Sequence, residues 1–177
     1  ATNFFLAPQI SEIENIARST IILSVSILTS AIFVSKKKTE EKLSFLKTFN
    51  EKVINSVDDA ILVIDPNNFQ VISANDAALK QLKLSMNDLI GKTCHEATHH
   101  RSTPCEPPHD VCPIQEMLTT GKSVMVEHQH LDQENCRTDV EVTVHPVKDK
   151  NGKIIQVAHI DRDITKRKEI ERVEKAK

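Results

Sequence analysis

The chain of 177 residues contains no tryptophan and no tyrosine. A cage or stacking platform built on tryptophan is therefore excluded, and any strong colour of the protein would come from a bound group. The sequence also has little net charge, because 23 lysines and arginines nearly balance 25 aspartates and glutamates. A formal charge of −2 gives no basic field of the kind that attracts nucleic acid, so we expect no nucleic-acid partner.

Motifs of common enzymes are missing as well. The sequence has no phosphate-binding glycine loop, no His-Glu-x-x-His motif of zinc hydrolases, and no kinase or cyclase motif. Cysteine and histidine occur together in residues 94–113, but no orienting partner for a Cys–His nucleophile stands at a recognisable place. We therefore expect that this chain is not an enzyme.

One long apolar run lies near the N-terminus. Residues 19–35 carry no charged side chain, and three lysines follow them directly. A helix of this length spans about 26 Å, close to the thickness of a hydrocarbon core. We expect a single-pass helix of the inner (cytoplasmic) membrane with its lysine end in the cytoplasm, and an extracytoplasmic or incomplete segment over residues 1–18. The serines and threonines of the run leave a buried or partner-packed helix as the alternative.

Residues 36–57 predict a polar helix with an apolar seam. The seam positions recur three and four residues apart, at Leu43, Leu46, Asn50, Val53 and Val57. This is a heptad pattern, and an asparagine at a core position fixes the register and favours two strands. We therefore expect a coiled-coil signalling helix that forms a parallel homodimer. The alternative is a short amphipathic helix that packs on its own domain.

Residues 58–163 predict one α+β domain, since the chain is too short for two full domains. The expected strands are residues 60–65, 69–74, 123–131, 138–147 and 154–161. Asn75 is expected to cap a helix over residues 76–82, and residues 85–121 are expected to hold short helices and irregular chain. This order implies a five-stranded antiparallel sheet with helices on one face. Residues 164–177 predict a charged helix that leaves the domain, with the basic run 166–168 solvated.

Three of the four cysteines fall within residues 94–113. Cys94, His99, Cys105 and Cys112 give the spacing C-x4-H-x5-C-x6-C. Thiolate and imidazole are ligands suited to zinc and to iron–sulfur clusters, and the prolines of this segment keep it from forming a regular helix. The spacing matches no zinc finger, no ferredoxin and no covalent haem motif, so the metal stays open.

Further cysteines and histidines extend the candidate site. His128 and His130 stand two residues apart on an expected strand and so share one face. If that face is the core, they point towards the cysteine segment, as ligands, as hydrogen-bond donors to a ligand, or as ordinary polar groups. His109 is a reserve ligand and Cys136 an additional candidate. We expect no such role for the remaining four histidines. His95 and His100 are expected in solvent, and His145 and His159 are expected to be ordinary strand residues.

Several segments resemble a PAS domain over about residues 50–168. They are the strand-turn-strand DAILVIDPNNFQVISAN, the N-D-A-A opening at Asn75, Ile90-Gly91-Lys92, the turn DKNGKII, and the exit Asp161-Arg162-Asp163-Ile164-Thr165. The flanking helices resemble the membrane anchor and coiled linker of bacterial sensor proteins, usually histidine kinases or diguanylate cyclases. This resemblance implies a cytoplasmic sensor that passes its signal to a kinase or cyclase module, with the histidine kinase type favoured.

The cysteine segment resembles a cysteine-bearing PAS variant of anaerobic bacteria and archaea. In that variant a C-x4-H…P-C…C-P stretch precedes the third strand, which implies that Cys94, His99, Cys105 and Cys112 act as a unit. Cys136 departs from the pattern, because a turn glycine is typical there.

Our leading hypothesis is a sensory module whose metal or iron–sulfur group relays redox, gas or metal state through residues 154–161 to the exit helix. The alternatives are a structural zinc in a domain that senses a small molecule or a membrane-side input, and a non-covalent haem held by a histidine such as His99. The thiols could also be buried apolar groups or form a redox disulfide.

Overall fold

The computed structural model describes residues 6–106 and 111–176, with side chains from residue 15 onwards. Two compact units divide the chain, one up to Asn50 and one over Glu51–Lys177. The predicted membrane helix and linker belong to one continuous helix, α1 (Leu6–Asn55).

The apolar part of α1 is long and apolar enough to cross a membrane, judged by length and composition alone. Four hydroxyl side chains of this part do not oppose this, because they donate to carbonyl oxygens of the preceding turn. Thr20 Oγ1 lies 2.8 Å from the carbonyl oxygen of Ala17, and Ser30 Oγ lies 2.8 Å from that of Ser26. Such bonds satisfy a hydroxyl group inside the helix itself. These serines and threonines are therefore compatible with an apolar environment.

The second unit contains the predicted antiparallel sheet. Its strands are β1 (Ala60–Ile64), β2 (Val71–Ala74), β3 (Val124–Leu131), β4 (Arg137–Lys148) and β5 (Ile154–Asp163). They lie in the order β2-β1-β5-β4-β3 with antiparallel neighbours, as expected. β2 begins two residues later than predicted, because Phe69 has a positive φ of 62° and belongs to the turn. That turn closes with a bond from Asp65 N to Gln70 O.

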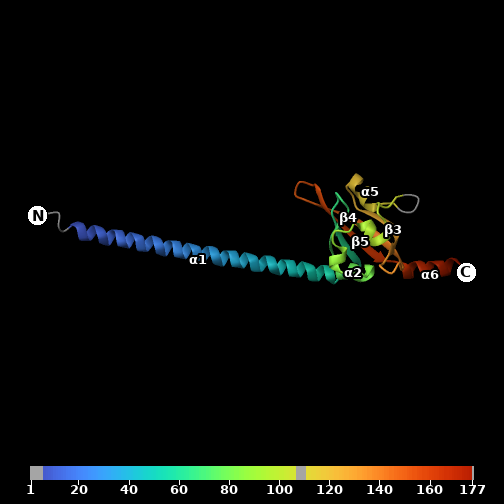
Figure 1. Cartoon of the computed structure of the whole chain (residues 1–177), viewed down its shortest axis with the longest axis horizontal. Helices are drawn as coiled ribbons and strands as arrows, with labels where there is room; N and C mark the ends of the chain where they lie inside the picture. Colours follow the sequence, from blue (N-terminus) through green and yellow to red (C-terminus); the bar gives the residue numbers. More distant parts are fainter. Residues whose placement is uncertain (1–5, 107–110, 177) are drawn as a thin grey trace. The chain divides into compact units, whose positions relative to one another are not determined.

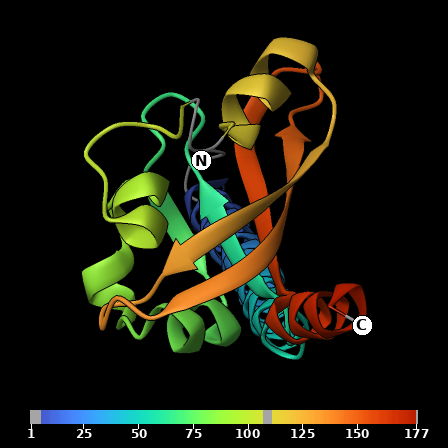
Figure 2. The ribbon, with the colours of Figure 1, turned by 90° about the vertical axis from the view of Figure 1, so that its right-hand side faces the viewer.

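Short helices cover one face of this sheet (Figures 1 and 2). They are α2 (Asp76–Leu82), α3 (Met86–Leu89), α4 (Cys94–His99) and α5 (Pro113–Thr120). The core forms between the helices and the inward-facing strand residues, and its fully buried members include Leu62, Val142, Val144, Leu89 and Met117. Alternating strand residues point to this face, which places His128, His130, His159 and Asp161 inside the domain.

The exit helix α6 (Thr165–Lys175) has no buried residue, and its basic run 166–168 is largely exposed, as expected. Two side chains of this run also form ion pairs with the outer surface of the sheet. Arg167 lies 2.9 Å from Glu127 of β3, and Lys168 also pairs with Glu127. A strand residue on the edge of the sheet therefore contacts the first turns of the exit helix.

Candidate metal centre

The helix α4 fixes the first two candidate ligands. Thr93 and Glu96 form a capping box, in which Thr93 Oγ1 accepts from Glu96 N and Glu96 Oε2 accepts from Thr93 N at 2.8 Å. The helix ends at His100, which adopts a left-handed conformation with φ of 52°. Within these limits Cys94 and His99 stand at the two ends of α4, and both are buried.

The next two candidates belong to the proline-containing segment. Cys105 and Cys112 are 7% and 6% exposed, so both thiols are inside the domain. Cys112 is the residue at the start of α5, and Pro113 occupies the first helical position, where its fixed φ is suited to a helix. His109 falls within residues 107–110, outside the described residues, so the structure does not place this candidate.

All four spaced candidates line one small cavity. Cys94, His99, Cys105 and Cys112 contribute to its wall, together with His128 from β3 and His159 from β5. The cavity measures about 10 Å³, roughly the space of one water molecule or one ion. The structure thus brings together the four positions of the sequence pattern and adds two strand histidines to them.

Three donor groups lie especially close. The candidate ligand atoms of His99, Cys105 and His128 all lie within 4.8 Å of one another. Donor atoms around a tetrahedral zinc are about 3–4 Å apart, so a modest closure would bring these three to bonding distance. His128 Nε2 lies 3.0 Å from the carbonyl oxygen of Val111. Because a carbonyl can only accept, His128 donates this bond through Nε2.

Burial sets the protonation of these groups. Burial, with Cys112 and Cys105 nearby, raises the pKa of the Cys94 thiol to about 12. Burial also lowers the pKa of His99 to about 3, and the neighbouring His130 and His128 act in the same direction. At neutral pH His99 is thus a neutral imidazole that is ready to bind a metal, whereas Cys94 would release a proton on metal binding. No disulfide joins the four cysteines, which all lie in the described part of the chain.

A buried carboxylate lies behind the cavity and was missed by sequence reasoning. Asp161 Oδ1 lies 3.0 Å from His159 Nδ1, and Asp161 Oδ2 lies 3.3 Å from His130 Nδ1. Burial acts to raise the pKa of Asp161, but the imidazoles of His159 and His130 outweigh it and hold this pKa below its usual range. The carboxylate is therefore ionised inside the domain.

One expectation for the histidines was wrong, and a second residue has a position that was not foreseen. His159 lies on a strand, as expected, but it is 4% exposed and lines the cavity. The alternation of Val157, His159 and Asp161 along β5 would have placed all three on the core face. His95 was expected in solvent, but it is 4% exposed and its ring centroid lies 6.4 Å from that of Phe69.

The remaining candidates lie away from the cavity. His145 is exposed on β4 and contacts Ser123. Cys136 is exposed in the turn between β3 and β4, near the carboxylates of Asp132 and Glu134. Lys83 pairs with both carboxylates, since its Nζ lies 2.9 Å from Asp132 Oδ2 and also contacts Glu134. The surroundings of Cys136 are thus those of an ion pair.

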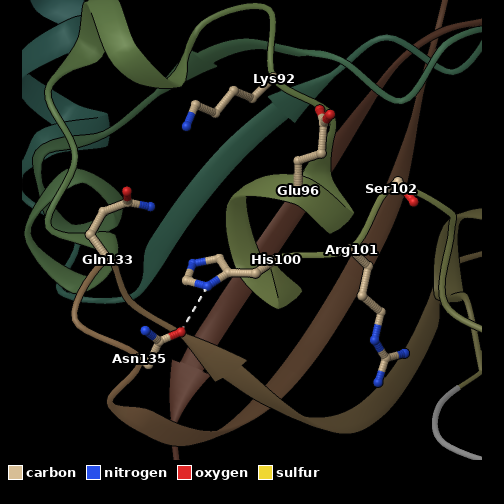
Figure 3. Close-up of a pocket in the computed structure, with 7 residues that line it drawn as sticks. All are labelled: Lys92, Glu96, His100, Arg101, Ser102, Gln133 and Asn135. Atoms are coloured by element: carbon tan, nitrogen blue, oxygen red, sulfur yellow. Dashed lines mark hydrogen bonds between the residues drawn. The ribbon is translucent and has the colours of Figure 1, made fainter.

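A larger pocket of about 580 Å³ lies on the surface beside α4. Its lining is polar and includes Lys92, Glu96 and Gln133. His100 is exposed, as expected, and Figure 3 shows it directed to Asn135, at 3.1 Å, with Arg101 directed away from both. This pocket contains none of the cysteines, so its size does not make it the better candidate for metal chemistry.

Known proteins share the fold of this chain. An RNA-binding light-oxygen-voltage receptor is 18% identical, with a TM-score of 0.62, and the match covers 75% of this chain but only 38% of that one. The PAS domain of an HTR-like protein from Haloarcula marismortui is 18% identical, with a TM-score of 0.58 and coverage of 72% and 99%. A PAS domain from Colwellia psychrerythraea is 21% identical, with a TM-score of 0.56 and coverage of 69% and 98%.

Identities of this size show the fold alone, and no curated protein matches the chain. The family assignment rests on the sequence itself, because the family model described as a PAS domain matches residues 58–166. That range contains the whole sheet, the helices over it and the cavity of cysteines and histidines. This chain therefore belongs to the PAS-domain family, whose members typically serve as sensory modules in signalling proteins.

Proposed function

We propose that this chain is a membrane-anchored sensory module that binds a transition metal at the cavity of α4, α5 and β3. One observation carries the proposal: the donor atoms of His99, Cys105 and His128 lie within 4.8 Å of one another. The thiols of Cys94 and Cys112 stand in the same wall and supply further donors. Such a mixed thiolate and imidazole set suits zinc and other thiophilic metals.

The donor set favours a single ion over the other groups considered, because its three closest donors are two imidazoles and one thiol, whereas iron–sulfur clusters are typically held by four thiolates. The cavity of about 10 Å³ has the size of one ion, so a cluster or a haem would require it to open. Within the proposal, the bound ion replaces the thiol protons and ties the segment of Cys105 and Cys112 to the sheet.

The signal would leave the domain through the strands that hold the ligands. His128 faces the cavity from β3, and the adjacent Glu127 faces outwards and pairs with Arg167 of α6. β5 carries His159 in the cavity wall and leads directly into α6. Metal ligation that shifts either strand therefore changes what α6 contacts. A switch of this kind needs two states that differ by a few kcal/mol, which metal ligation easily supplies.

The remaining parts of the proposal concern the helices. The apolar part of α1 would cross the cytoplasmic membrane and leave the PAS domain in the cytoplasm. The heptad seam would pair two copies, and the exposure of Leu43 and Leu46, 67% and 44%, is consistent with a seam that awaits a partner helix. A histidine kinase or cyclase module would receive the signal from α6.

The test is elemental analysis of the protein purified without oxygen, together with its visible spectrum. We expect about one metal ion per chain and little colour with zinc. Cys105→Ser and His128→Ala should lose most of the metal, while the matched controls Cys136→Ser and His145→Ala should keep it. If the protein contains iron and sulfide and absorbs broadly in the visible range, the bound group is an iron–sulfur cluster and not a single ion. A metal-free protein that also fails to take up added zinc or cobalt would refute the proposal.

A further inference from the structure

Unsatisfied polar atoms gather at one place behind the metal cavity. In the described part of the chain, five buried side-chain atoms lack a hydrogen-bond partner, and four of them belong to His130, His159 and Asp161. Buried polar groups are nearly always hydrogen-bonded, so a cluster of exceptions points to a role beyond packing. The three residues are 2%, 4% and 2% exposed, and bulk water does not reach them freely.

The carboxylate of Asp161 stands at the centre of this cluster. Its two oxygens each approach the Nδ1 atom of a different imidazole, at 3.0 Å for His159 and 3.3 Å for His130. Both distances suit hydrogen bonds, but the atoms are not aligned for them. A small rotation of either ring would align its N–H with the carboxylate. Asp161 thus holds two imidazoles in place without fully fixing their orientation.

The cluster is in direct contact with the proposed ligands. The ring of His130 packs edge to face against that of His99, with centroids 4.8 Å apart and planes at 87°. On the other side of the carboxylate, His159 forms part of the cavity wall. A chain of contacts therefore runs from His99 on α4, through His130 on β3, to Asp161 on β5.

We propose that Asp161 is a positioning residue of the metal centre, which orients the ligand His99 through His130 and fixes the cavity wall through His159. The inference rests on the proposed metal binding and adds residues that the Cys/His segment does not contain. Carboxylates that fix imidazoles around a metal are a general feature of metal sites, and their loss costs about 10–100-fold in metal affinity. Here the carboxylate acts on the ligand through a second imidazole.

This arrangement also gives the metal a route to the exit helix. Asp161 is followed by Arg162 and Asp163, the last residues of β5, and α6 begins at Thr165. When a bound ion fixes the ring of His99, the rings of His130 and His159 must adapt to it, and the carboxylate that holds both belongs to the strand that leads into α6. Asp161 thereby joins the ligand helix to the signalling end of the sheet.

The test is a Co²⁺ titration of the whole chain in detergent, followed by the ligand-field absorption bands. Asp161→Asn keeps the side-chain volume and removes the charge, and we expect it to weaken Co²⁺ binding about tenfold or more and to shift the bands. His130→Gln should shift both quantities in the same direction. Asp58→Asn and His145→Gln are the controls on exposed residues, and both should match the wild type.

The double variant separates positioning from a general loss of structure. If Asp161 acts through His130, Asp161→Asn with His130→Gln should bind Co²⁺ about as well as Asp161→Asn alone. Thermal melts by circular dichroism identify any variant that does not fold. If one of the two single variants does not fold, the Co²⁺ affinity and bands of the other are compared with those of the wild type. Additive effects on affinity, or bands unchanged in both single variants, would overturn the inference. A wild-type chain that binds no Co²⁺ would instead overturn the proposed function.

Discussion

Asn75 offers the sharpest test of how the domain is held to the end of α1. Its side chain is fully buried, and Oδ1 accepts hydrogen bonds from Ile61 N of β1 and Ala78 N of α2, both at 2.9 Å. Its Nδ2 donates to the carbonyl oxygen of Asp59 at 3.0 Å and to that of Ile54 at 3.3 Å. One amide therefore joins the last turn of α1, the first strand and the first short helix.

The cost of removing this amide follows from the groups that it leaves behind. Asn75→Ala leaves the N–H groups of Ile61 and Ala78 without their acceptor, and each buried unsatisfied donor costs about 1–3 kcal/mol. The loss of the cap of α2 is part of this sum and amounts to about 1 kcal/mol by itself. We expect a decrease of about 2–5 kcal/mol in the free energy of unfolding, a large share of the roughly 5–15 kcal/mol of an ordinary domain.

A second substitution separates the cost of losing the hydrogen bond to α2 from the cost of losing the hydrogen bond to β1. Serine is an efficient cap but is too short to reach β1 as well, so Asn75→Ser should recover about 1 kcal/mol relative to Asn75→Ala. Urea denaturation of the unit Glu51–Lys177, followed by far-UV circular dichroism, measures both variants, since the chain has no tryptophan or tyrosine to report by fluorescence. Asn87→Ala, at an exposed position of α3, is the control and should stay within about 0.5 kcal/mol of the wild type. The reasoning fails if Asn75→Ala costs less than about 1 kcal/mol, or if serine restores nothing.

Three further predictions follow from the ion pairs and the seam. Glu127→Gln removes the partner of Arg167 and Lys168, so amide hydrogen exchange in α6 should become faster, whereas Glu169→Gln should leave it unchanged. The second prediction concerns Asp132. Its carboxylate pairs with Lys83 and accepts hydrogen bonds from backbone N–H groups, and these contacts hold the pKa of Asp132 below its usual range. The contribution of Asp132 to the free energy of unfolding should therefore be complete above about pH 4 and decrease as the pH falls further. Urea melts of Lys83→Met should show a weaker decrease of stability with falling pH. A pH profile identical to that of the wild type would contradict this prediction. Asn50→Leu should stabilise the proposed dimer but broaden its oligomeric states in sedimentation, and an unchanged monomer would contradict the seam.

Much of the fold could be predicted because short-range patterns determine it. Alternation along the strands and the Asn75 cap gave the correct order of elements, and the five-stranded sheet is confirmed. The start of β2 was placed too early, because nothing in the residue type of Phe69 announces its positive φ of 62°. The ion pairs of α6 were missed for a different reason: Arg167 and Glu127 are far apart in sequence, and only the folded sheet brings them together.

The candidate site divides in the same way. Cys94, His99, Cys105 and Cys112 are close in sequence, so their spacing alone identifies them as a group. The inward direction of His128 and His130 followed from strand alternation, and their burial agrees with it. The same alternation holds along β5 and buries His159 and Asp161, although Asp161 is not among the predicted site residues. No single segment of sequence indicates that a carboxylate of β5 meets an imidazole of β3.

The contacts of α6 suggest how a small shift at the cavity could be enlarged. The start of the helix is fixed to β4, because Ile164 N donates to Asp139 O at 2.9 Å and Asp139 N donates to Thr165 Oγ1 at 3.2 Å. The next residues contact two strands: Arg167 and Lys168 pair with Glu127 of β3, the edge strand that also holds His128, while Arg167 and Arg172 pair with carboxylates of β4. Since β3 has a neighbour on only one side in the described sheet, it can move relative to β4 more easily than the inner strands can. A shift of β3 relative to β4 would then change which strand the basic side chains of α6 contact, and with it the direction in which the helix leaves the domain.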